Sequence, residues 1–264
     1  MDLGLKGKTA VVSGSTAGIG LAIATALAAE GASVIINGRT EARVAAAIKK
    51  IRSDVAGAQV QGAAADLGTQ DGVETFLNQA PKADILVNNL GIFEAKPFAQ
   101  IADADWLRFF EVNVLSGVRL ARHYLPGMRE KNWGRMIFIS SESAVNIPSE
   151  MIHYGMTKTA QVAVARGLAE SVSGTGITVN SILVGPTNSE GVGNFLQELA
   201  RQQGVTAAQV EKEFFEKVRP SSLLKRFEKP EEVAAVVAFV ASAQGAVING
   251  AALRAEGGVV RSAL

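Results

Sequence analysis

Short apolar segments alternate with longer helix-forming segments along almost the whole chain of 264 residues, and this alternation limits the folds open to it. A continuous apolar run is typical of a strand buried on both faces, as in a parallel sheet covered by helices. We expect strands at 8–13, 33–37, 59–65, 84–88, 135–140, 177–183 and 250–255. We expect helices at 19–30, 41–52, 72–79, 105–130, 154–171 and 230–241, with Pro126-Gly127 a candidate interruption of the long one.

These elements predict an α/β fold of the doubly wound, Rossmann-like type, with a parallel sheet of about seven strands and helices on both faces. The sequence contains no linker, repeat or low-complexity tract, so we expect residues 1–264 to form a single domain of this Rossmann type. The polar segment 185–226 interrupts the alternation and carries Phe195, Leu196, Phe214 and Phe215. We expect a helical excursion there, with a substrate lid around 187–226.

The composition argues against several classes of function. Lys and Arg total 26 and Asp and Glu 25, and this balance gives no electrostatic reason to expect nucleic acid or a membrane surface as a partner. The absence of cysteine excludes disulfides and thiolate chemistry, and His123 and His153 lack the spacing of a metal pair, so no metal site is predicted. The longest apolar run, 233–241, is far shorter than the ~20 residues of a membrane helix. We expect a cytoplasmic protein.

A glycine-rich segment joins the first expected strand to the first expected helix, with the sequence Ser13-Gly14-Ser15-Thr16-Ala17-Gly18-Ile19-Gly20. Glycine permits a tight turn and lets the backbone approach a pyrophosphate, which then lies at the helix N-terminus. The spacing is GxxxGxG rather than the commoner GxGxxG, and the alternative interpretation is an ordinary glycine turn. The position directly after the first strand favours dinucleotide binding.

The end of the second expected strand, Asn37-Gly38-Arg39-Thr40, bears on the choice of dinucleotide. An NAD enzyme usually places a carboxylate near this point, on the adenosine ribose. Here position 38 is glycine and Arg39 follows, and a guanidinium suits a phosphate dianion. We therefore favour NADP(H), with NAD(H) as the alternative and a solvated loop arginine as the simplest other interpretation. Ala17, where a basic side chain would strengthen the prediction, weakens it.

Tyr154 and Lys158 lie four residues apart near the start of an expected helix, so their side chains share one face. A phenol has an ordinary pKa of about 10, too high for a base at neutral pH. One positive charge at ~4 Å contributes roughly 4 kcal/mol at an effective dielectric of about 20, which corresponds to a pKa lower by about three. The pair can therefore make Tyr154 a proton-transfer group beside a cofactor.

Polar side chains also stand where other expected strands and helices approach the same crevice. Ser140, Ser141 and Ser143 end the fifth expected strand, where a hydroxyl can hydrogen-bond a substrate carbonyl. Asn113 interrupts the apolar part of the long helix, either to hold a water chain or as a contact that bends the helix. Asn88-Asn89-Leu90-Gly91 ends the fourth strand, where asparagines can tie neighbouring loops together or simply form a turn.

In the order and spacing of these motifs the chain resembles the short-chain dehydrogenase/reductase family, in the subgroup with TGxxxGIG, NNAG, Ser, YxxxK and PG motifs, from about Lys6 to Gly258. The resemblance implies a catalytic tetrad. Tyr154 would be the acid/base, and Ser141 would polarise the carbonyl. Lys158 would bind the nicotinamide ribose and lower the pKa of Tyr154, and Asn113 would position a relay water. Ser141 is preferred to Ser140 because its distance from the tyrosine matches the family.

The same resemblance implies cofactor-binding positions. They are Gly14, Ser15, Thr16, Gly18, Ile19, Gly20, Arg39, Asp66, Leu67, Asn89, Gly91, Tyr154, Lys158, Gly185, Pro186 and Thr187. Asp66 has an alternative interpretation as the cap of a turn before Gly68. The chain departs from the family pattern at four positions, Ser13, Leu90, Val184 and Glu256, and Leu90 is expected to crowd the cofactor groove.

These features predict an oxidoreductase that interconverts a ketone and a secondary alcohol with NADP(H) or NAD(H), with 3-oxoacyl compounds among the candidate substrates by family frequency. The alternative is a catalytically silent dinucleotide-sensing protein. The expected partners are a small carbonyl or alcohol substrate and further copies of the chain, as a tetramer or dimer. Candidates to line the pocket are Phe93, Asn146, Ile147, Met151, Phe195 and Phe214, and His153 is interpreted as a surface or lid contact.

Overall fold

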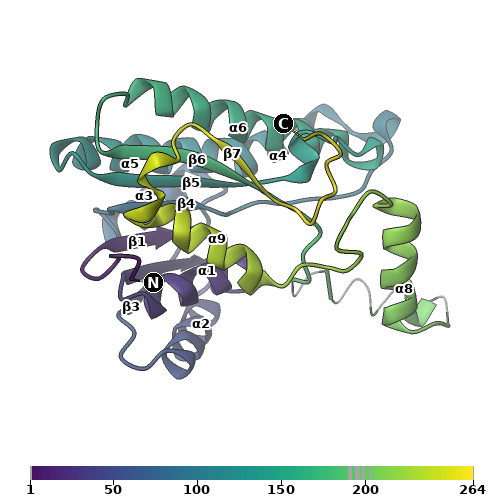
Figure 1. The fold of residues 1–264 in the computed structure, drawn as a ribbon, viewed down its shortest axis with the longest axis horizontal. Coiled ribbons are helices and arrows are strands. Elements are labelled where there is room, and N and C mark those ends of the chain that lie inside the picture. The colour runs from purple at the N-terminus through teal and green to yellow at the C-terminus, as the bar shows by residue number, and fades with distance from the viewer. Residues whose placement is uncertain (1, 190–191, 194–196, 198–199, 203, 264) are drawn as a thin grey trace.

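The computed structural model describes residues 2–189, 192–193, 197, 200–202 and 204–263. Seven parallel strands form one sheet, as predicted, and their order is β3-β2-β1-β4-β5-β6-β7 (Figure 1). The strands are β1 Thr9–Val12, β2 Ser33–Gly38, β3 Val60–Ala64, β4 Ile85–Asn88, β5 Gly134–Ser141, β6 Ile177–Val184 and β7 Ala252–Ala255. The α-helices are α1 Gly18–Ala29, α2 Glu41–Asp54, α3 Gln70–Gln79, α4 Asp103–Phe110, α5 Ser116–Glu130, α6 Ile152–Ser171, α8 Ala207–Glu213 and α9 Pro230–Ala241.

Helices cover both faces of the sheet, and each face has its own apolar core. Ile23 and Leu27 of α1 and Val237 of α9 are fully buried against one face, and Leu120 and Met128 of α5 against the other. Burial of each such side chain contributes roughly 1.5–3 kcal/mol. β1, β4, β5 and β6 are buried on both sides, as expected of strands in the interior of such a sheet.

The order of the strands reverses between β1 and β4, which are hydrogen-bonded neighbours with Val11 opposite Leu86. Chain segments that leave the carboxyl ends of these two strands turn away from each other, and a crevice forms between them. The glycine-rich segment follows β1, and Asn89-Leu90-Gly91 follows β4. The topology therefore brings the two motifs together at the place where such folds bind ligands.

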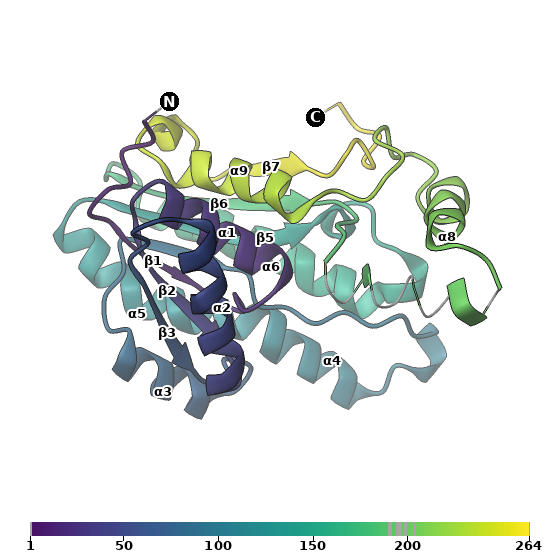
Figure 2. The same cartoon turned by 90° about the horizontal axis from the view of Figure 1, so that it is seen from below.

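One prediction about the elements needs correction. The long helix is not interrupted at Pro126, which lies inside α5 with its ring exposed while Tyr124 and Met128 remain packed on the sheet. The irregularity instead lies at Glu111–Leu115, a π-helical turn between α4 and α5. The excursion after β6 does form a helix, α8, which stands away from the sheet beside the carboxyl ends of the strands (Figures 1 and 2).

Candidate active site

The glycine-rich segment passes close to its neighbours at three glycines. Gly14 and Gly18 have positive φ angles of 60° and 54°, which L-residues with a Cβ rarely adopt. A Cβ on Gly20 would lie 2.5 Å from the Gly14 carbonyl oxygen and 2.5 Å from Nδ2 of Asn89. The predicted turn is confirmed, and its geometry requires glycine at these positions.

Side chains in the segments that follow β1 and β4 hold this turn in place. Asn89 donates from Nδ2 to the carbonyls of Ser13 and Gly14, both at 3.0 Å, so the predicted tie between the two loops is confirmed. The Ser13 hydroxyl accepts from the backbone N–H of Asn89 at 2.9 Å. Ser15 is fully buried and donates to the Val12 carbonyl at 2.6 Å, so its side chain faces the sheet. Any contact of Ser15 with a cofactor is therefore through its backbone.

Asn37 was not among the predicted site residues, although it fixes the shape of the site. Its Oδ1 accepts from the Gly14 N–H at 3.2 Å, and its Nδ2 donates to the carbonyls of Ala63 and Ala65. A buried amide that bridges β1, β2 and β3 leaves no pattern in the sequence beyond a single polar residue at the end of an apolar strand. Asn37 thereby joins the glycine turn to the adenosine side of the crevice.

The residues at the start of α1 and around Gly91 fit a bound dinucleotide. Helix α1 begins at Gly18 with Ala17 as its N-cap, and alanine has no side-chain acceptor for the first N–H groups, which can then serve an anion. Opposite, a Cβ on Gly91 would lie 3.4 Å from Nζ of Lys158 and 3.5 Å from Oδ1 of Asn113. A side chain at 91 would therefore fill the approach to Lys158.

The sequence predicts that the adenosine of a dinucleotide would lie beside the end of β2. Arg39 is exposed directly after β2. A Cβ on Gly38 would lie 2.4 Å from Cγ2 of Thr16, so a carboxylate at 38 would require Thr16 to move. Asp66 is exposed and caps a turn by accepting from the Gly68 N–H at 3.0 Å. Leu67 is 1% exposed and belongs to the core, so only its backbone can face a cofactor.

The segment Gly185-Pro186-Thr187 lies on the opposite side of the crevice and continues to Ser189. A Cβ on Gly18 would lie 3.2 Å from the Cβ of Ser189. The backbone of this segment pairs with Glu228, whose N–H donates to the Pro186 carbonyl at 2.8 Å. The Glu228 side chain is buried beside Gly185 and Glu256. Burial raises the pKa of Glu228 from 4.5 to about 7, and the charge of Glu256 adds to the rise, while the Gly185 N–H opposes it.

We expect Glu228→Gln to stabilise the protein at pH 8 but not at pH 5. The fold favours the neutral acid, so the stability contributed by this group is present below the unfolded pKa of 4.5 and is lost as the pH rises through about 7. The cost of ionising Glu228 at pH 8 is at most about 3 kcal/mol. Urea unfolding at the two pH values measures it, with the exposed Glu231→Gln on α9 as control. A gain of equal size at both pH values would contradict this account.

Only one of the two tyrosines of the chain lies at the crevice. Tyr124 lies on the buried face of α5, and its hydroxyl donates to the Ala80 carbonyl at 2.6 Å. Tyr154 lies in the first turn of α6, half-buried, with its ring edge-on to Phe93 at 6.4 Å between centroids. The structure therefore leaves a single phenol available for chemistry at the carboxyl ends of the strands.

Lys158 lies one turn beyond Tyr154 on the same face of α6, as predicted. Its Nζ is 5.6 Å from the centre of the Tyr154 ring and donates to the Ile139 carbonyl at 2.9 Å and to Oε1 of Gln161 at 3.2 Å. These acceptors are neutral, so Lys158 is held in the crevice without a carboxylate. Burial lowers the pKa of Lys158 from 10.5 to about 8.

The expectation that Lys158 brings the Tyr154 pKa down is not met in the protein alone. Burial raises the pKa of Tyr154 from 10.0 to about 12, against the interaction with the Ser141 hydroxyl and the charge of Arg219, which lower it. Glu142 raises it further. A full charge at ~4 Å in a partly solvated site would lower the pKa of the phenol, whereas here Lys158 is buried and its Nζ lies 5.6 Å from the centre of the half-buried Tyr154 ring.

The two serines at the end of β5 have different partners. Ser140 donates its hydroxyl to the Lys158 carbonyl at 2.8 Å, inside the protein. Ser141 lies beside Tyr154, donates to Oε2 of Glu142 at 2.7 Å and accepts from the Ser143 N–H at 3.1 Å. The geometry thus supports the preference for Ser141, because only its hydroxyl lies next to the phenol.

Asn113 lies in the π-helical turn and is 1% exposed. Its Oδ1 accepts from the Ile92 N–H at 2.7 Å, and its Nδ2 donates to the Ile92 carbonyl and to the Thr157 hydroxyl. The backbone carbonyl of Asn113 accepts from Nε2 of Gln161 at 2.6 Å. These bonds tie the turn after Gly91 to α6, which favours the helix-bending interpretation, and the placing of a relay water stays a prediction.

The candidates for the pocket separate into two groups. Phe93 and Ile147 are 61% and 50% exposed beside the start of α6, where Ile147 lies against Gly155. Phe214 instead packs on Phe215 and Phe227 inside the excursion. Phe195 lies outside the described residues. His153 is reassigned, since it is fully buried, 4.1 Å from the Phe109 ring and 6.0 Å from Trp106.

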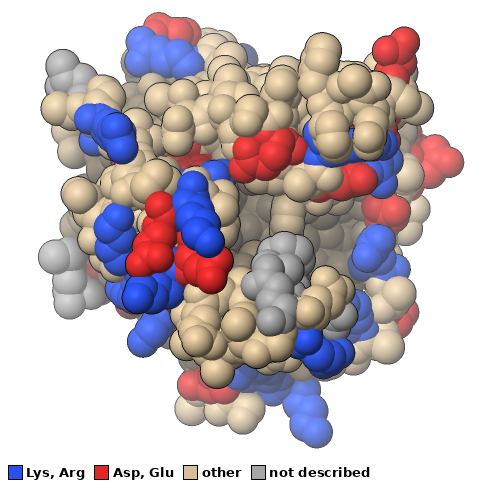
Figure 3. Space-filling model, turned by 90° about the vertical axis from the view of Figure 1, so that its right-hand side faces the viewer, with Lys and Arg blue, Asp and Glu red and all other residues tan. Residues whose placement is uncertain are grey.

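Figure 3 shows the molecule from the side of α8, with acidic and basic side chains interspersed around a hollow. Among the residues that the structure describes, no group of acidic and histidine side chains could hold a metal ion. Within the same residues no helix is both long and apolar enough to cross a membrane.

Comparison with known proteins agrees with this geometry. The family model described as short chain dehydrogenase matches residues 8–200. An uncharacterized oxidoreductase of Bacillus subtilis (strain 168), YvaG, is 50% identical over 262 residues and covers 99% of each chain. The D-beta-hydroxybutyrate dehydrogenase of Cupriavidus necator is 33% identical over 260 residues, which are 97% of this chain and 99% of the relative.

A solved structure has nearly the same fold over the whole chain. The L-sorbose reductase of Gluconobacter frateurii, complexed with NADPH and L-sorbose, has a TM-score of 0.94 at 32% sequence identity. The match covers 99% of this chain and 100% of that one.

Proposed function

The chain belongs to the short-chain dehydrogenase family and is an oxidoreductase of that family, and from this premise we propose that it interconverts a ketone and a secondary alcohol with NADP(H). The observation that carries the proposal is the grouping of Tyr154, Lys158 and the Ser141 hydroxyl at the mouth of the crevice, next to Gly91. The named relatives support it, because beta-hydroxybutyrate is a secondary alcohol and L-sorbose a ketone.

Each residue has a task that follows from its place. Tyr154 gives a proton to the carbonyl oxygen in reduction and takes it back in oxidation, and Ser141 donates a hydrogen bond to that oxygen. Lys158 holds the nicotinamide ribose and keeps positive charge near the phenol. Asn113 keeps the turn after Gly91 against α6. When bound, the dinucleotide supplies or accepts the hydride and, when oxidised, brings a positive charge that favours the phenolate.

The rim of the site favours ketones with an apolar substituent. Phe93, Ile147 and Val218 are 61%, 50% and 46% exposed, and Phe93 touches the Tyr154 ring. A panel of aliphatic and aryl ketones, 3-oxoacyl esters and ketoses, assayed with NADPH and NADH by absorbance, tests the proposal. Turnover of any member supports it. Tight NADPH binding without turnover on the whole panel would instead favour a dinucleotide-sensing protein.

We expect Arg39→Asp to weaken NADPH binding by about 10- to 100-fold, because a charge-assisted bond to phosphate contributes roughly 1.5–3 kcal/mol. NADH binding should be unchanged or tighter. Titration of nicotinamide fluorescence gives both dissociation constants. Lys49→Asp, on an exposed position of α2, is the control for net charge. Equal losses for the two cofactors would refute the role of Arg39.

A further inference from the structure

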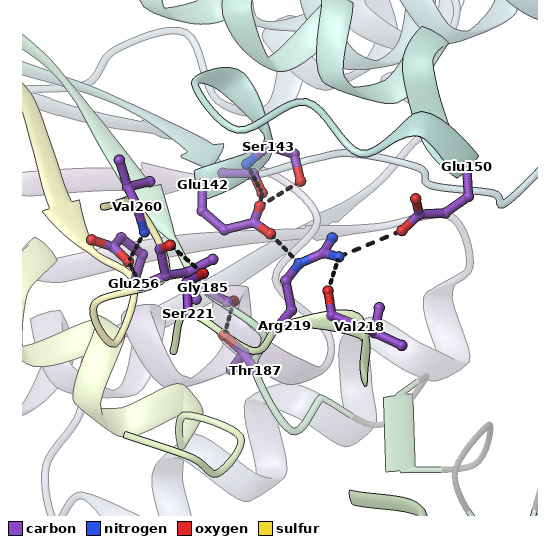
Figure 4. A network of polar contacts seen from close by, with 12 residues as sticks. Glu142, Ser143, Glu150, Gly185, Thr187, Val218, Arg219, Ser221, Glu256 and Val260 are labelled. Carbon is purple, nitrogen blue, oxygen red and sulfur yellow. Dashed lines mark hydrogen bonds and ion pairs between the residues drawn. The ribbon is translucent and has the colours of Figure 1, made fainter. Parts of the chain in front are cut away.

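A buried carboxylate stands directly behind Ser141 and is not part of the tetrad. Glu142 is 3% exposed, and both of its oxygens are fully engaged. Oε2 accepts the hydroxyl protons of Ser141, at 2.7 Å, and of Ser143. Oε1 accepts from Nε of Arg219 at 2.8 Å (Figure 4). A carboxylate buried in this way requires a charged partner, and Arg219 supplies it.

Arg219 reaches this place from a distant part of the chain. It follows the π-helical turn Phe214–Val218 that continues α8, 77 residues after Glu142, and is 8% exposed. Figure 4 shows its guanidinium between Glu142 and Glu150, whose Oε1 lies 3.5 Å from Nη1. The guanidinium also lies 6.0 Å from the centre of the Phe214 ring. The Glu142–Arg219 pair thus links the excursion to the segment Ser141–Ser143 at the end of β5.

The link acts on the proton of Ser141. A serine hydroxyl has one proton, and here it points to Glu142. A substrate carbonyl needs the same proton, so it must compete with a carboxylate, which is the stronger acceptor. The ion pair with Arg219 draws charge toward Oε1 and weakens the hold of Oε2 on Ser141. Without Arg219, the carboxylate would retain the serine proton.

We propose that Glu142 and Arg219 are a pair of positioning residues through which the segment 207–219 governs the hydrogen bond that Ser141 offers to the substrate and the charge beside Tyr154. The proposal rests on the proposed function, since it assumes that Ser141 and Tyr154 contact the substrate oxygen. The pair gives the segment 207–219 an influence on Ser141 that the tetrad alone does not provide, because the position of Arg219 determines whether the charge of Glu142 is compensated.

The charged groups around Tyr154 come from three elements. Lys158 lies on its own helix, Glu142 after β5, and Arg219, with Glu150 behind it, after α8. Glu142 and Arg219 act on the phenol with opposite sign. On the α4 side, Glu94, Lys96, Asp105 and Arg108 lie around His153. Changes at Glu142 and Arg219 should therefore move the titration of the phenol in opposite directions.

The test is the pH profile of kcat/KM for alcohol oxidation at saturating NADP⁺, in which the rising limb reports deprotonation of the phenol. We expect Glu142→Gln to move this limb to lower pH, and Arg219→Met to move it to higher pH, each by about one pH unit. The double variant should return close to wild type. The Glu150 side chain is 45% exposed and lies behind Arg219, so Glu150→Gln should move the rising limb by less than half as much as Glu142→Gln.

A conservative variant separates charge from shape. Arg219→Lys keeps the positive charge and loses the planar guanidinium. The rising limb of its pH profile should therefore stay near the wild-type position, while kcat falls by about tenfold. This variant remains informative if Arg219→Met does not fold. NADPH titration and thermal unfolding establish that each variant is folded.

The outcomes for the pair and for the proposed function are distinct. Shifts in the same direction, or no shift, with Tyr154→Phe inactive, would overturn the role of the pair and leave the proposed function standing. Full activity of Tyr154→Phe would overturn the proposed function itself.

Discussion

Tyr154→Phe is expected to reduce kcat/KM for ketone reduction by about 10²- to 10⁴-fold, the usual contribution of a positioned acid–base group. The variant loses only the hydroxyl, and the ring keeps its edge-on contact with Phe93. No other phenol lies at the crevice, because the second tyrosine of the chain lies on the buried face of α5. Steady-state kinetics with NADPH and the best ketone of the panel measures the loss, and the NADPH dissociation constant should change little.

Tyr124→Phe is the matched control. It removes the same atom from the other tyrosine and breaks the bond to the Ala80 carbonyl, which costs about 1 kcal/mol of stability. Its turnover should stay within a few-fold of wild type. If the two variants lost activity equally, the loss would come from folding rather than from proton transfer. Undiminished activity of Tyr154→Phe would remove the role given to that residue.

The parts of this molecule that depend on local sequence were predictable. The seven predicted segments became the seven strands, and the four central ones, β1, β4, β5 and β6, are buried on both sides as expected of a parallel sheet covered by helices. The glycine turn was predictable because its φ angles require glycine, and so was the pairing of Tyr154 with Lys158, which follows from helical spacing. Topology then brings the ends of β1, β4 and β5 together without further information.

The parts that depend on distant contacts were not predictable. The π-helical turn at Asn113 forms because the amide binds Ile92 and Thr157, 21 and 44 residues away. Glu142 finds Arg219 across 77 residues, and no spacing rule relates them. The raised pKa of Tyr154 in the protein alone has the same origin, because the burial of the phenol depends on what packs over it rather than on the helix that carries it.

Ser141→Ala, compared with Ser140→Ala, is the second large effect we expect. Removing a donor aimed at the reacting oxygen costs about 10²–10³ in kcat. The neighbouring serine donates to the Lys158 carbonyl inside the protein, so its loss should lower stability by about 1 kcal/mol and leave kcat within a few-fold. Single-turnover rates with NADPH, together with thermal unfolding, separate the two effects.

The comparison is informative because the two side chains are adjacent and chemically identical. They differ only in the side of β5 from which they emerge, since successive residues of a strand face opposite ways. Ser141 also donates to Oε2 of Glu142. In Ser141→Ala, Oε2 keeps the hydrogen bond from the Ser143 hydroxyl and Oε1 keeps Arg219, so the segment 141–143 should stay folded. A larger loss of kcat in Ser140→Ala than in Ser141→Ala would place the carbonyl-binding hydroxyl at 140 and overturn the assignment of Ser141.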